Sequence, residues 1–193
     1  MQTLFYELIY FLIMALDLGF GSSHQKGLGH LVKVNIAISG AKLLSTYNEL
    51  TKLCTKPKSL LLTLGSNDIQ LRRGWPTPHQ EIEILKKFQE LLIMRSQWQP
   101  KKKFLVILPL PRYYSKSRRV ARDRYTHIMS ILEQLMKDTL LIIGERARYI
   151  RILSFQELMK DPENFQKDFV HLSAKGIAII TEKVEKTYAC MEL

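Results

Sequence analysis

The chain has 193 residues, of which 46% are apolar and 24% charged, and it carries a formal net charge of +11. This length suits one domain with a substantial core, and the balance of apolar and charged residues excludes an intrinsically disordered chain. No repeat and no low-complexity tract divides the sequence, which argues against solenoid and fibrous architectures. We therefore expect a single domain over residues 1–193, with residues 1–13 as an apolar N-terminal extension.

The N-terminal segment, LFYELIYFLIMALDLGF, is apolar but contains Glu7 and Asp17. Its uninterrupted apolar run covers residues 8–16, whereas a membrane-spanning helix needs about 20 apolar residues. A secretory signal begins with basic residues and ends in a small-residue cleavage site, but the first basic residue here is Lys26. We expect the segment to lead into the fold, and a signal peptide is the alternative left open.

Short apolar runs alternate with longer segments of helical periodicity along the chain. In chain order the predicted elements are strands at 13–20, 30–39 and 59–65, a helix at 78–94, a strand at 103–111, a helix at 122–137, a strand at 148–155 and a helix at 174–191. Such alternation is typical of a parallel sheet with helices on both faces. Ligands bind beyond the carboxyl ends of strands in these sheets, so the residues that follow each strand are candidates for a site.

Three of the predicted elements carry an apolar stripe that we interpret as core. The second strand has β-branched residues on one face, namely Val32, Val34, Ile36 and Ile38. The helix at 78–94 has a stripe at helical spacing, formed by Ile82, Leu85, Phe88 and Leu92. The helix at 122–137 has a longer stripe, formed by Tyr125, Ile128, Met129, Leu132, Leu135 and Met136.

Glycines and serines follow the first two predicted strands. The stretch FGSSH places Ser22 and Ser23 in a glycine-rich turn, where a serine hydroxyl can serve as a nucleophile next to a helix N-terminus. A serine N-cap is the common structural alternative. Gly40 follows the second strand and offers a backbone N–H that no side chain obstructs, although a plain strand-to-helix turn uses the same residue.

Polar side chains follow the third and fifth predicted strands. Asn67 follows the third strand, and its side-chain amide donates two hydrogen bonds; an Asx-turn is the structural alternative. Asp168 and His171 follow the fifth strand at a spacing that lets the carboxylate orient the imidazole, which can then deprotonate a serine. A cap on the final helix is the alternative for this pair. Together the strand ends supply a nucleophile, a base, an orienting acid and oxyanion donors, a combination that favours an enzyme over a binding module.

The order of these motifs resembles that of the SGNH hydrolase (GDSL-type esterase/lipase) family. FGSSH at 20–24 resembles the Gly-Asp-Ser block, and NIAISGA at 35–41 resembles the glycine block. LGSND at 64–68 resembles the Gly-x-Asn-Asp block, and DFVHLSAKG at 168–176 resembles the Asp-x-x-His-Leu block. The resemblance implies a flavodoxin-like three-layer α/β/α sandwich with a five-stranded parallel sheet in the order 2-1-3-4-5.

The resemblance also implies a role for each matching residue. Ser23 would be the nucleophile, His171 the general base and then the general acid, and Asp168 the residue that orients the imidazole. The N–H of Ser23, the N–H of Gly40 and the side chain of Asn67 would form the oxyanion hole. The implied reaction is hydrolysis of a carboxylic (acyl or acetyl) ester of a small molecule or lipid, with no metal and no cofactor. Ser22 stands where the family has aspartate, which raises the question of which hydroxyl attacks.

The positive charge of the chain points to a different class of function. Ten of the 29 Lys and Arg residues lie between Arg95 and Arg124, together with a single acid, Asp123. This basic segment predicts weak, salt-sensitive binding to nucleic acid or to an anionic membrane. The alternative function is therefore an SGNH-like nucleic-acid-binding module with weak or no catalysis, similar to domains found in some retroelement proteins. Against it, no aromatic residues are interleaved with the charges to stack on bases.

The remaining candidates carry structural interpretations. Cys54 and Cys190 have neither metal-ligand spacing nor the pattern of a disulfide scaffold, which favours a reducing, cytoplasmic compartment over secretion. His24 follows the serine turn and is interpreted as a turn residue or pocket wall. Residues 112–114 follow the fourth strand and are interpreted as a surface loop, with a place beside the substrate as the alternative.

Overall fold

The computed structural model describes residues 16–38, 42–43, 48–49, 58–63, 65–69, 75–97, 103–114 and 118–191, without the side chains of Phe20 and Ser23. Over these residues the chain forms one parallel sheet with the strand order β2-β1-β3-β4-β5. The strands are β1 Leu16–Gly21, β2 Val32–Ala37, β3 Ser59–Thr63, β4 Lys103–Ile107 and β5 Ile150–Leu153. All five predicted strands and the predicted order are confirmed, while the extension at 1–13 lies outside the described residues.

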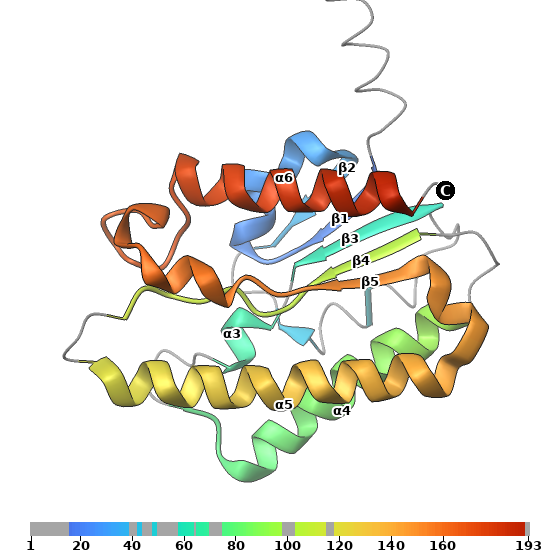
Figure 1. The fold of residues 1–193 in the computed structure, drawn as a ribbon, viewed down its shortest axis with the longest axis horizontal. Coiled ribbons are helices and arrows are strands. Elements are labelled where there is room, and N and C mark those ends of the chain that lie inside the picture. Colours follow the sequence, from blue (N-terminus) through green and yellow to red (C-terminus); the bar gives the residue numbers. More distant parts are fainter. Residues whose placement is uncertain are drawn as a thin grey trace, which may run out of the picture.

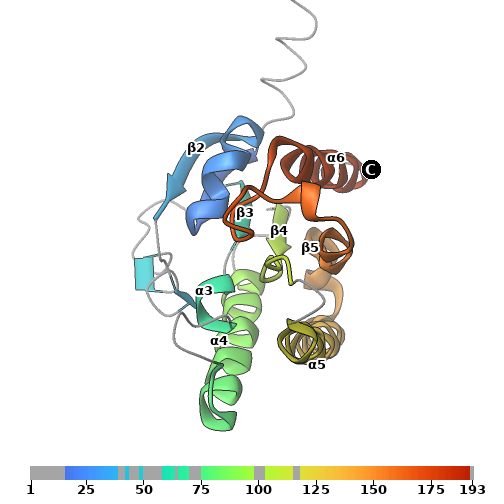
Figure 2. The same ribbon diagram turned by 90° about the vertical axis from the view of Figure 1, so that its left-hand side faces the viewer.

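Helices cover both faces of this sheet (Figures 1 and 2). One face carries α4 Pro78–Ser96 and α5 Arg119–Ile143, with the short α3 Ser66–Ile69 beside α4. The other face carries the 3-10 helix η1 Ser23–Leu31 and α6 Ala174–Cys190. Further 3-10 turns follow α5 and β5, namely η3 Gly144–Tyr149, η4 Gln156–Lys160 and η5 Pro162–Asn164. The three-layer α/β/α sandwich expected from the sequence is confirmed.

The central strand β3 shows why the sheet needs two helical layers. All five of its residues are buried, as expected for a parallel strand covered on both faces. Leu60 and Leu62 belong to the core under α4 and α5, whereas Leu61 belongs to the core under η1 and α6. The strand alternation thus divides one apolar run between two cores.

Helix α4 begins where the sequence predicts and extends beyond the core at its N-terminal end. Thr77 and Gln80 form a reciprocal capping box, and Pro78 is the first helical residue, so the start is fixed locally. Phe88 and Leu92 are buried as expected, but Ile82 is 52% exposed. The prediction that Ile82 packs in the core is wrong, because the first turns of α4 lie away from the sheet (Figure 2) and its buried residues begin at Phe88.

Helix α5 is longer than the predicted segment 122–137. Five of its six stripe residues are buried, and the hydroxyl of the fully buried Tyr125 donates to the carbonyl of Pro109 over 2.6 Å. The helix continues to Ile143 and ends at Gly144, whose φ of 66° lies in the left-handed region that glycine tolerates. The packed part of the helix also extends past the stripe, since Thr139 is buried and Leu140 and Ile143 pack against the same core.

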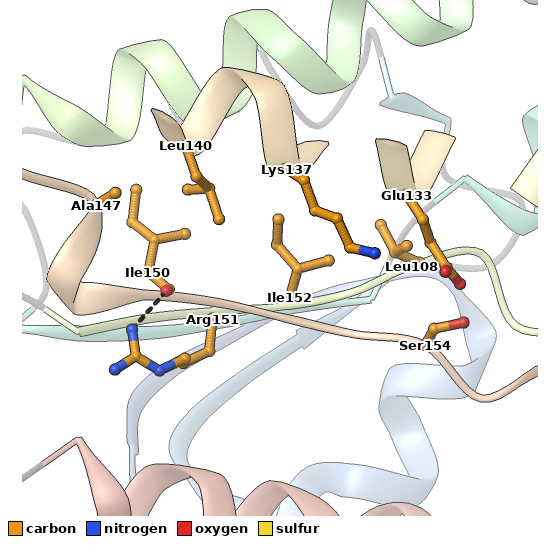
Figure 3. A pocket seen from close by; sticks show the side chains of 9 residues that line it. All are labelled: Leu108, Glu133, Lys137, Leu140, Ala147, Ile150, Arg151, Ile152 and Ser154. Atoms are coloured by element: carbon orange, nitrogen blue, oxygen red, sulfur yellow. Dashed lines mark hydrogen bonds between the residues drawn. The ribbon is translucent and has the colours of Figure 1, made fainter. Parts of the chain in front are cut away.

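The two edge strands, β2 and β5, differ in how well they are covered. On β2, Val32 is buried but Val34 is 55% exposed, so the expected continuous apolar face is interrupted at this edge. On β5, Nη1 of Arg151 donates to the carbonyls of Arg148 and Ile150 over 2.8 and 2.9 Å (Figure 3). Leu153 O accepts from Leu108 N on the β4 side, and strand alternation places the Ile150 carbonyl on the outer side. Arg151 thus covers backbone acceptors at the outer edge of the sheet.

Candidate active site

The serine turn begins where β1 ends against β3. A Cβ on Gly21 would lie 2.1 Å from Oγ1 and 2.4 Å from the carbonyl O of Thr63, so only glycine fits at this strand end. Ser22 N donates to Thr63 O over 3.0 Å, and Ser22 is 1% exposed. Ser22 occupies the N-cap position of η1 but makes no side-chain capping bond. Ser23 is the first residue of η1, and its side chain lies outside the described residues.

The next residue, His24, joins this turn to a loop far away in the sequence. Its Nε2 lies 3.2 Å from the carbonyl O of Val170, and its Nδ1 lies 3.4 Å from Oγ of Ser22. Its ring centroid lies 5.9 Å from that of His171. Burial lowers the pKa of His24 below its ordinary value. These contacts bring the turn that contains Ser23 next to the loop that contains His171.

That loop contains the predicted acid and base, and the two are in direct contact. Nδ1 of His171 lies 2.5 Å from Oδ2 of Asp168, and the two side chains are 45% and 46% exposed. Oδ1 of Asp168 accepts from the backbone N–H groups of Val170 and His171, each over 2.9 Å. The hydrogen bond from His171 lowers the pKa of Asp168 to about 2. Asp168 is therefore ionised at neutral pH and faces one nitrogen of the imidazole.

The junction of this loop with α6 explains the glycine of the final motif. Ser173, and not Asp168, is the N-cap of α6, since its Oγ accepts from Gly176 N over 3.2 Å. Ser173 N donates to Asn164 O over 3.0 Å. A Cβ on Gly176 would lie 2.2 Å from that same carbonyl oxygen. Asp168 therefore does not cap α6, which was the alternative interpretation of this residue.

The candidate oxyanion residues are described in part. Asn67 is half-buried in α3, directly after the end of β3, whereas Gly40 lies outside the described residues. The start of α3 requires Gly65, whose φ is 90° and whose Cβ would lie 2.7 Å from Phe88 and from Pro109. Asp68 accepts from Leu43 N over 3.1 Å, and burial raises the pKa of Asp68 to about 6. Asp68 thus ties α3 to the segment that follows β2.

The chain resembles known proteins in its three-dimensional structure. No protein-family model and no curated protein sequence matches the chain. The lipase/acylhydrolase from Enterococcus faecalis is 17% identical, and the match covers 90% of this chain and 95% of that one with a TM-score of 0.61. A GDSL-like lipase from Bacteroides thetaiotaomicron is 17% identical, with coverages of 90% and 87% and a TM-score of 0.62. A catalytic mutant of an acetylxylan esterase from Geobacillus stearothermophilus is 14% identical, with coverages of 90% and 94% and a TM-score of 0.64.

The fold is that of the SGNH hydrolases. The similarity extends over nine-tenths of this chain. At these identities the similarity shows the fold alone, whereas the chemistry depends on the residues at the strand ends.

In the loop after β4, the neighbouring residues Tyr113 and Tyr114 pack against different parts of the fold. The N–H of Tyr113 donates to Phe169 O over 3.0 Å, and the rings of the two residues lie 5.3 Å apart. Tyr114 instead packs against Trp75 and Tyr125 at the edge of the core, and burial raises the pKa of Tyr114 to about 12. Tyr113 therefore supports the loop of the acid and base, and Tyr114 has a structural role.

The basic segment 95–124 does not form one uniform surface over its described residues. Arg95 is 4% exposed and its guanidinium lies 5.8 Å from the ring centroid of Phe104. Arg124 donates to Oε1 of Glu81 over 2.7 Å. Arg119 and Arg122 remain largely exposed, at 79% and 46% of their side-chain surface, and contact Asp123. Binding of polyanions through this segment stays a prediction.

A separate groove of about 340 Å³ lies between α5 and β5 (Figure 3). Its lining residues are Leu108, Glu133, Lys137, Leu140, Ala147, Ile150, Arg151, Ile152 and Ser154. None of the candidate catalytic residues lines this groove. Over the part of the chain that the structure describes, no cluster of three metal-ligating side chains occurs, and no helix is long and apolar enough to span a bilayer.

Proposed function

We propose that the chain is a serine ester hydrolase that cleaves a carboxylic ester of a small molecule or lipid. Ser23 acts as the nucleophile, His171 as the general base and acid, and Asp168 as the residue that orients the imidazole. The observation that carries the proposal is the 2.5 Å contact between Asp168 Oδ2 and His171 Nδ1. Because the ionised carboxylate accepts a hydrogen bond from Nδ1–H, Nε2 is the nitrogen that exchanges a proton with substrate or serine.

The reaction follows from these roles in two balanced halves. In the first, Ser23 Oγ forms a bond to the ester carbonyl carbon while His171 Nε2 accepts the hydroxyl proton. The tetrahedral adduct then expels the alcohol, which leaves with the proton from His171. In the second half, His171 deprotonates a water molecule that attacks the acyl-serine, and the proton returns to Ser23 as the carboxylic acid leaves.

The oxyanion of each tetrahedral adduct needs hydrogen-bond donors at the same strand ends. We assign the N–H groups of Ser23 and Gly40 and the side-chain amide of Asn67 to this role. Asn67 follows β3 and Ser23 follows β1, and these two strands are hydrogen-bonded neighbours whose ends coincide at Gly21 and Thr63. A single donor in such a site contributes about 10²–10³ in turnover.

The burial of Ser22 supports Ser23 as the attacking residue. Ser22 is 1% exposed and its Oγ lies 3.4 Å from His24 Nδ1, so its hydroxyl is directed to the interior and not to an incoming ester. Neighbours in the SGNH fold with the printed names acetylxylan esterase, lipase and acylhydrolase agree with ester hydrolysis as the reaction class.

The decisive experiment is labelling with a serine-reactive fluorophosphonate, followed by peptide mass spectrometry to locate the modified residue. We expect the label on Ser23 and none in Ser23→Ala, which should also lose hydrolysis of p-nitrophenyl acetate. The matched variant Ser22→Ala should keep both the label and most of the activity. A label on Ser22 would overturn the assignment of Ser23 as the nucleophile. A wild-type chain that neither reacts nor hydrolyses would overturn the proposed activity and favour the nucleic-acid-binding alternative.

A further inference from the structure

His24 is the residue whose contacts link the serine turn to the acid–base loop. It lies one position after Ser23 in η1, and its partner Val170 lies between Asp168 and His171. The side chain is buried deeply enough to lower its pKa. The sequence offered one signal for this contact, a histidine directly after the turn serine, but the partner lies 146 positions away.

The two contacts of the His24 ring fit one tautomer of the neutral imidazole. Val170 contributes a carbonyl oxygen, which only accepts, so Nε2 must carry the hydrogen of this 3.2 Å bond. Nδ1 then holds a lone pair, and the Ser22 hydroxyl at 3.4 Å can donate to it. A neutral imidazole in one tautomer thus satisfies both partners. Burial lowers the pKa of His24 more than the hydrogen bond to Val170 raises it, and the charges of His171 and Arg112 lower it further, which agrees with the neutral form.

The loop has other supports, but they come from different parts of the fold. Phe169 O accepts from Tyr113 N over 3.0 Å, which holds the loop toward the end of β4. His171 O accepts from Gln166 N over 2.7 Å, a hydrogen bond that closes the loop on itself. The bond from His24 ties the loop to η1, the element that contains the proposed nucleophile.

We propose that His24 is a positioning residue, which sets the separation between the serine turn and the Asp168–His171 pair through its hydrogen bond to the Val170 carbonyl. The proposal rests on the proposed function for its effect on catalysis. His24 touches neither substrate nor reacting atoms in this scheme. It acts by holding residues 168–171 against η1, where a displacement of about 1 Å between reacting groups can cost on the order of 10² in rate.

Two amide variants distinguish the effect of the hydrogen bond to Val170 O from the effect of burying a polar side chain at position 24. In His24→Gln the amide reaches about as far as Nε2 and can still donate to Val170 O. In His24→Asn the amide reaches only about as far as Nδ1, so it keeps the Ser22 contact and loses the Val170 contact. Neither side chain titrates. The matched control is His30→Asn, on the same 3-10 helix, where the histidine Nε2 contacts Thr181 Oγ1 at 3.0 Å on α6.

The primary measurement is steady-state hydrolysis of p-nitrophenyl acetate. We expect His24→Asn to lower kcat about 10–100-fold with KM changed less than about threefold, because only the positioning of reacting groups is affected. His24→Gln should recover kcat to within about threefold of wild type, and His30→Asn should leave kcat unchanged. A purely structural role would instead lower the melting temperature while the folded fraction kept its kcat.

Hydrogen–deuterium exchange supplies a readout that does not need activity. The amides of Val170 and His171 donate to Asp168 Oδ1, and they should exchange about five- to tenfold faster in His24→Asn but not in His24→Gln or His30→Asn. Equal exchange in the two His24 variants, or faster exchange in His24→Asn without a loss of kcat, overturns the positioning role. If the wild type is inactive, the proposed function fails, and the exchange comparison alone then decides whether His24 anchors the loop.

Discussion

Asp168 accepts hydrogen bonds from His171 at two separate points. Its Oδ1 accepts from the backbone N–H and its Oδ2 lies 2.5 Å from ring Nδ1. One carboxylate therefore fixes both the backbone turn and the orientation of the imidazole. The side chains of the pair stay nearly half exposed, which leaves part of the imidazole surface accessible to a substrate.

The variant Asp168→Asn should separate these two functions. Asparagine can still accept from the backbone N–H groups through its carbonyl oxygen, so the turn should persist. Its amide nitrogen would face Nδ1 and favour the wrong imidazole tautomer, and we expect kcat to fall by about 10²–10⁴ with little change in melting temperature. Steady-state kinetics and thermal unfolding measure the two effects.

Asp161→Asn is the matched control for this variant. Asp161 is another exposed acid, and it accepts from Lys175 Nζ over 2.7 Å and from Glu163 N over 2.9 Å. It lies outside the proposed chemistry, so kcat should stay at the wild-type value. Similar losses of kcat in the two variants would contradict a specific role for Asp168.

Asp68 makes stability depend on pH in a direction opposite to that of most acids. Burial raises the pKa of Asp68 to about 6, above the ordinary value of about 3.9 in the unfolded chain. Between these values the folded state holds more protons than the unfolded state, so stability falls as pH rises from about 4 to about 6. Above the folded pKa the loss is complete, because the carboxylate is then ionised in both states.

We expect Asp68→Asn to remove this loss. The amide oxygen can still accept from Leu43 N, while nothing ionises, so the variant should gain up to about 3 kcal/mol in unfolding free energy at pH 7 and little at pH 4. Denaturant unfolding at the two pH values measures the difference. Asp138→Asn, an exposed acid that accepts from Gln134, should show no such pH-dependent gain, and an equal gain at both pH values for Asp68→Asn would refute the account.

Phe169 is held in a conformation that side chains seldom adopt. Its φ is 56°, and no other non-glycine residue in the described chain has a positive φ. Phe169→Ala and Phe169→Gly both remove the ring contact with Tyr113, but only glycine relieves the backbone. We expect the glycine variant to be more stable than the alanine variant by about 0.5–1 kcal/mol, since the left-handed penalty outweighs the added freedom of the unfolded chain.

At the neighbouring position, Val170, we expect the alanine variant to be more stable than the glycine variant. Val170 does not have a positive φ, so Val170→Gly should be less stable than Val170→Ala by about 0.5–1 kcal/mol. Chemical denaturation of the four variants gives both differences. A glycine that is the less stable choice at both positions would show that the turn relaxes in solution to an ordinary conformation.

Gly176 permits the close approach of α6 to the turn that precedes the acid–base loop. A Cβ at this position would lie 2.2 Å from the backbone oxygen of Asn164, and a backbone atom cannot rotate away as a side chain can. We expect Gly176→Ala to cost about 3 kcal/mol in unfolding free energy. Gly144→Ala is the control without a steric clash: no atom lies within 4 Å of its Cβ, so its cost should be the backbone penalty alone, about 1–2 kcal/mol for its φ of 66° and ψ of −136°. Equal costs would show that α6 can shift without penalty.

Much of this architecture could be predicted from the sequence because it is encoded in local patterns. The continuous run of β3 and the stripe of α5 mark buried positions directly, and the three-residue spacing of Asp168 and His171 is short enough to indicate contact. The exposures of Val34 and Ile82 could not be predicted, because they depend on where the covering layers end and not on the pattern of either element.

The contact of His24 with Val170 could not be predicted from the sequence for a different reason. A bond between a side chain and a backbone carbonyl leaves no requirement on the residue type at position 170, so no pattern records the partner. The glycine at 176 was visible in the motif, but its physical reason, the oxygen of Asn164, belongs to another turn. A contact with a backbone oxygen of a distant segment can be recognised only from the three-dimensional structure.

The guanidinium of Arg151 has a consequence for how the molecule behaves in concentrated solution. The outer side of β5 would otherwise present backbone acceptors to which the edge of a second molecule could pair. By occupying the carbonyls of Arg148 and Ile150, and by placing a positive charge there, Arg151 discourages the sheet from growing across molecules. A neutral residue at this position would leave the strand open to aggregation, even though no part of the proposed chemistry lies nearby.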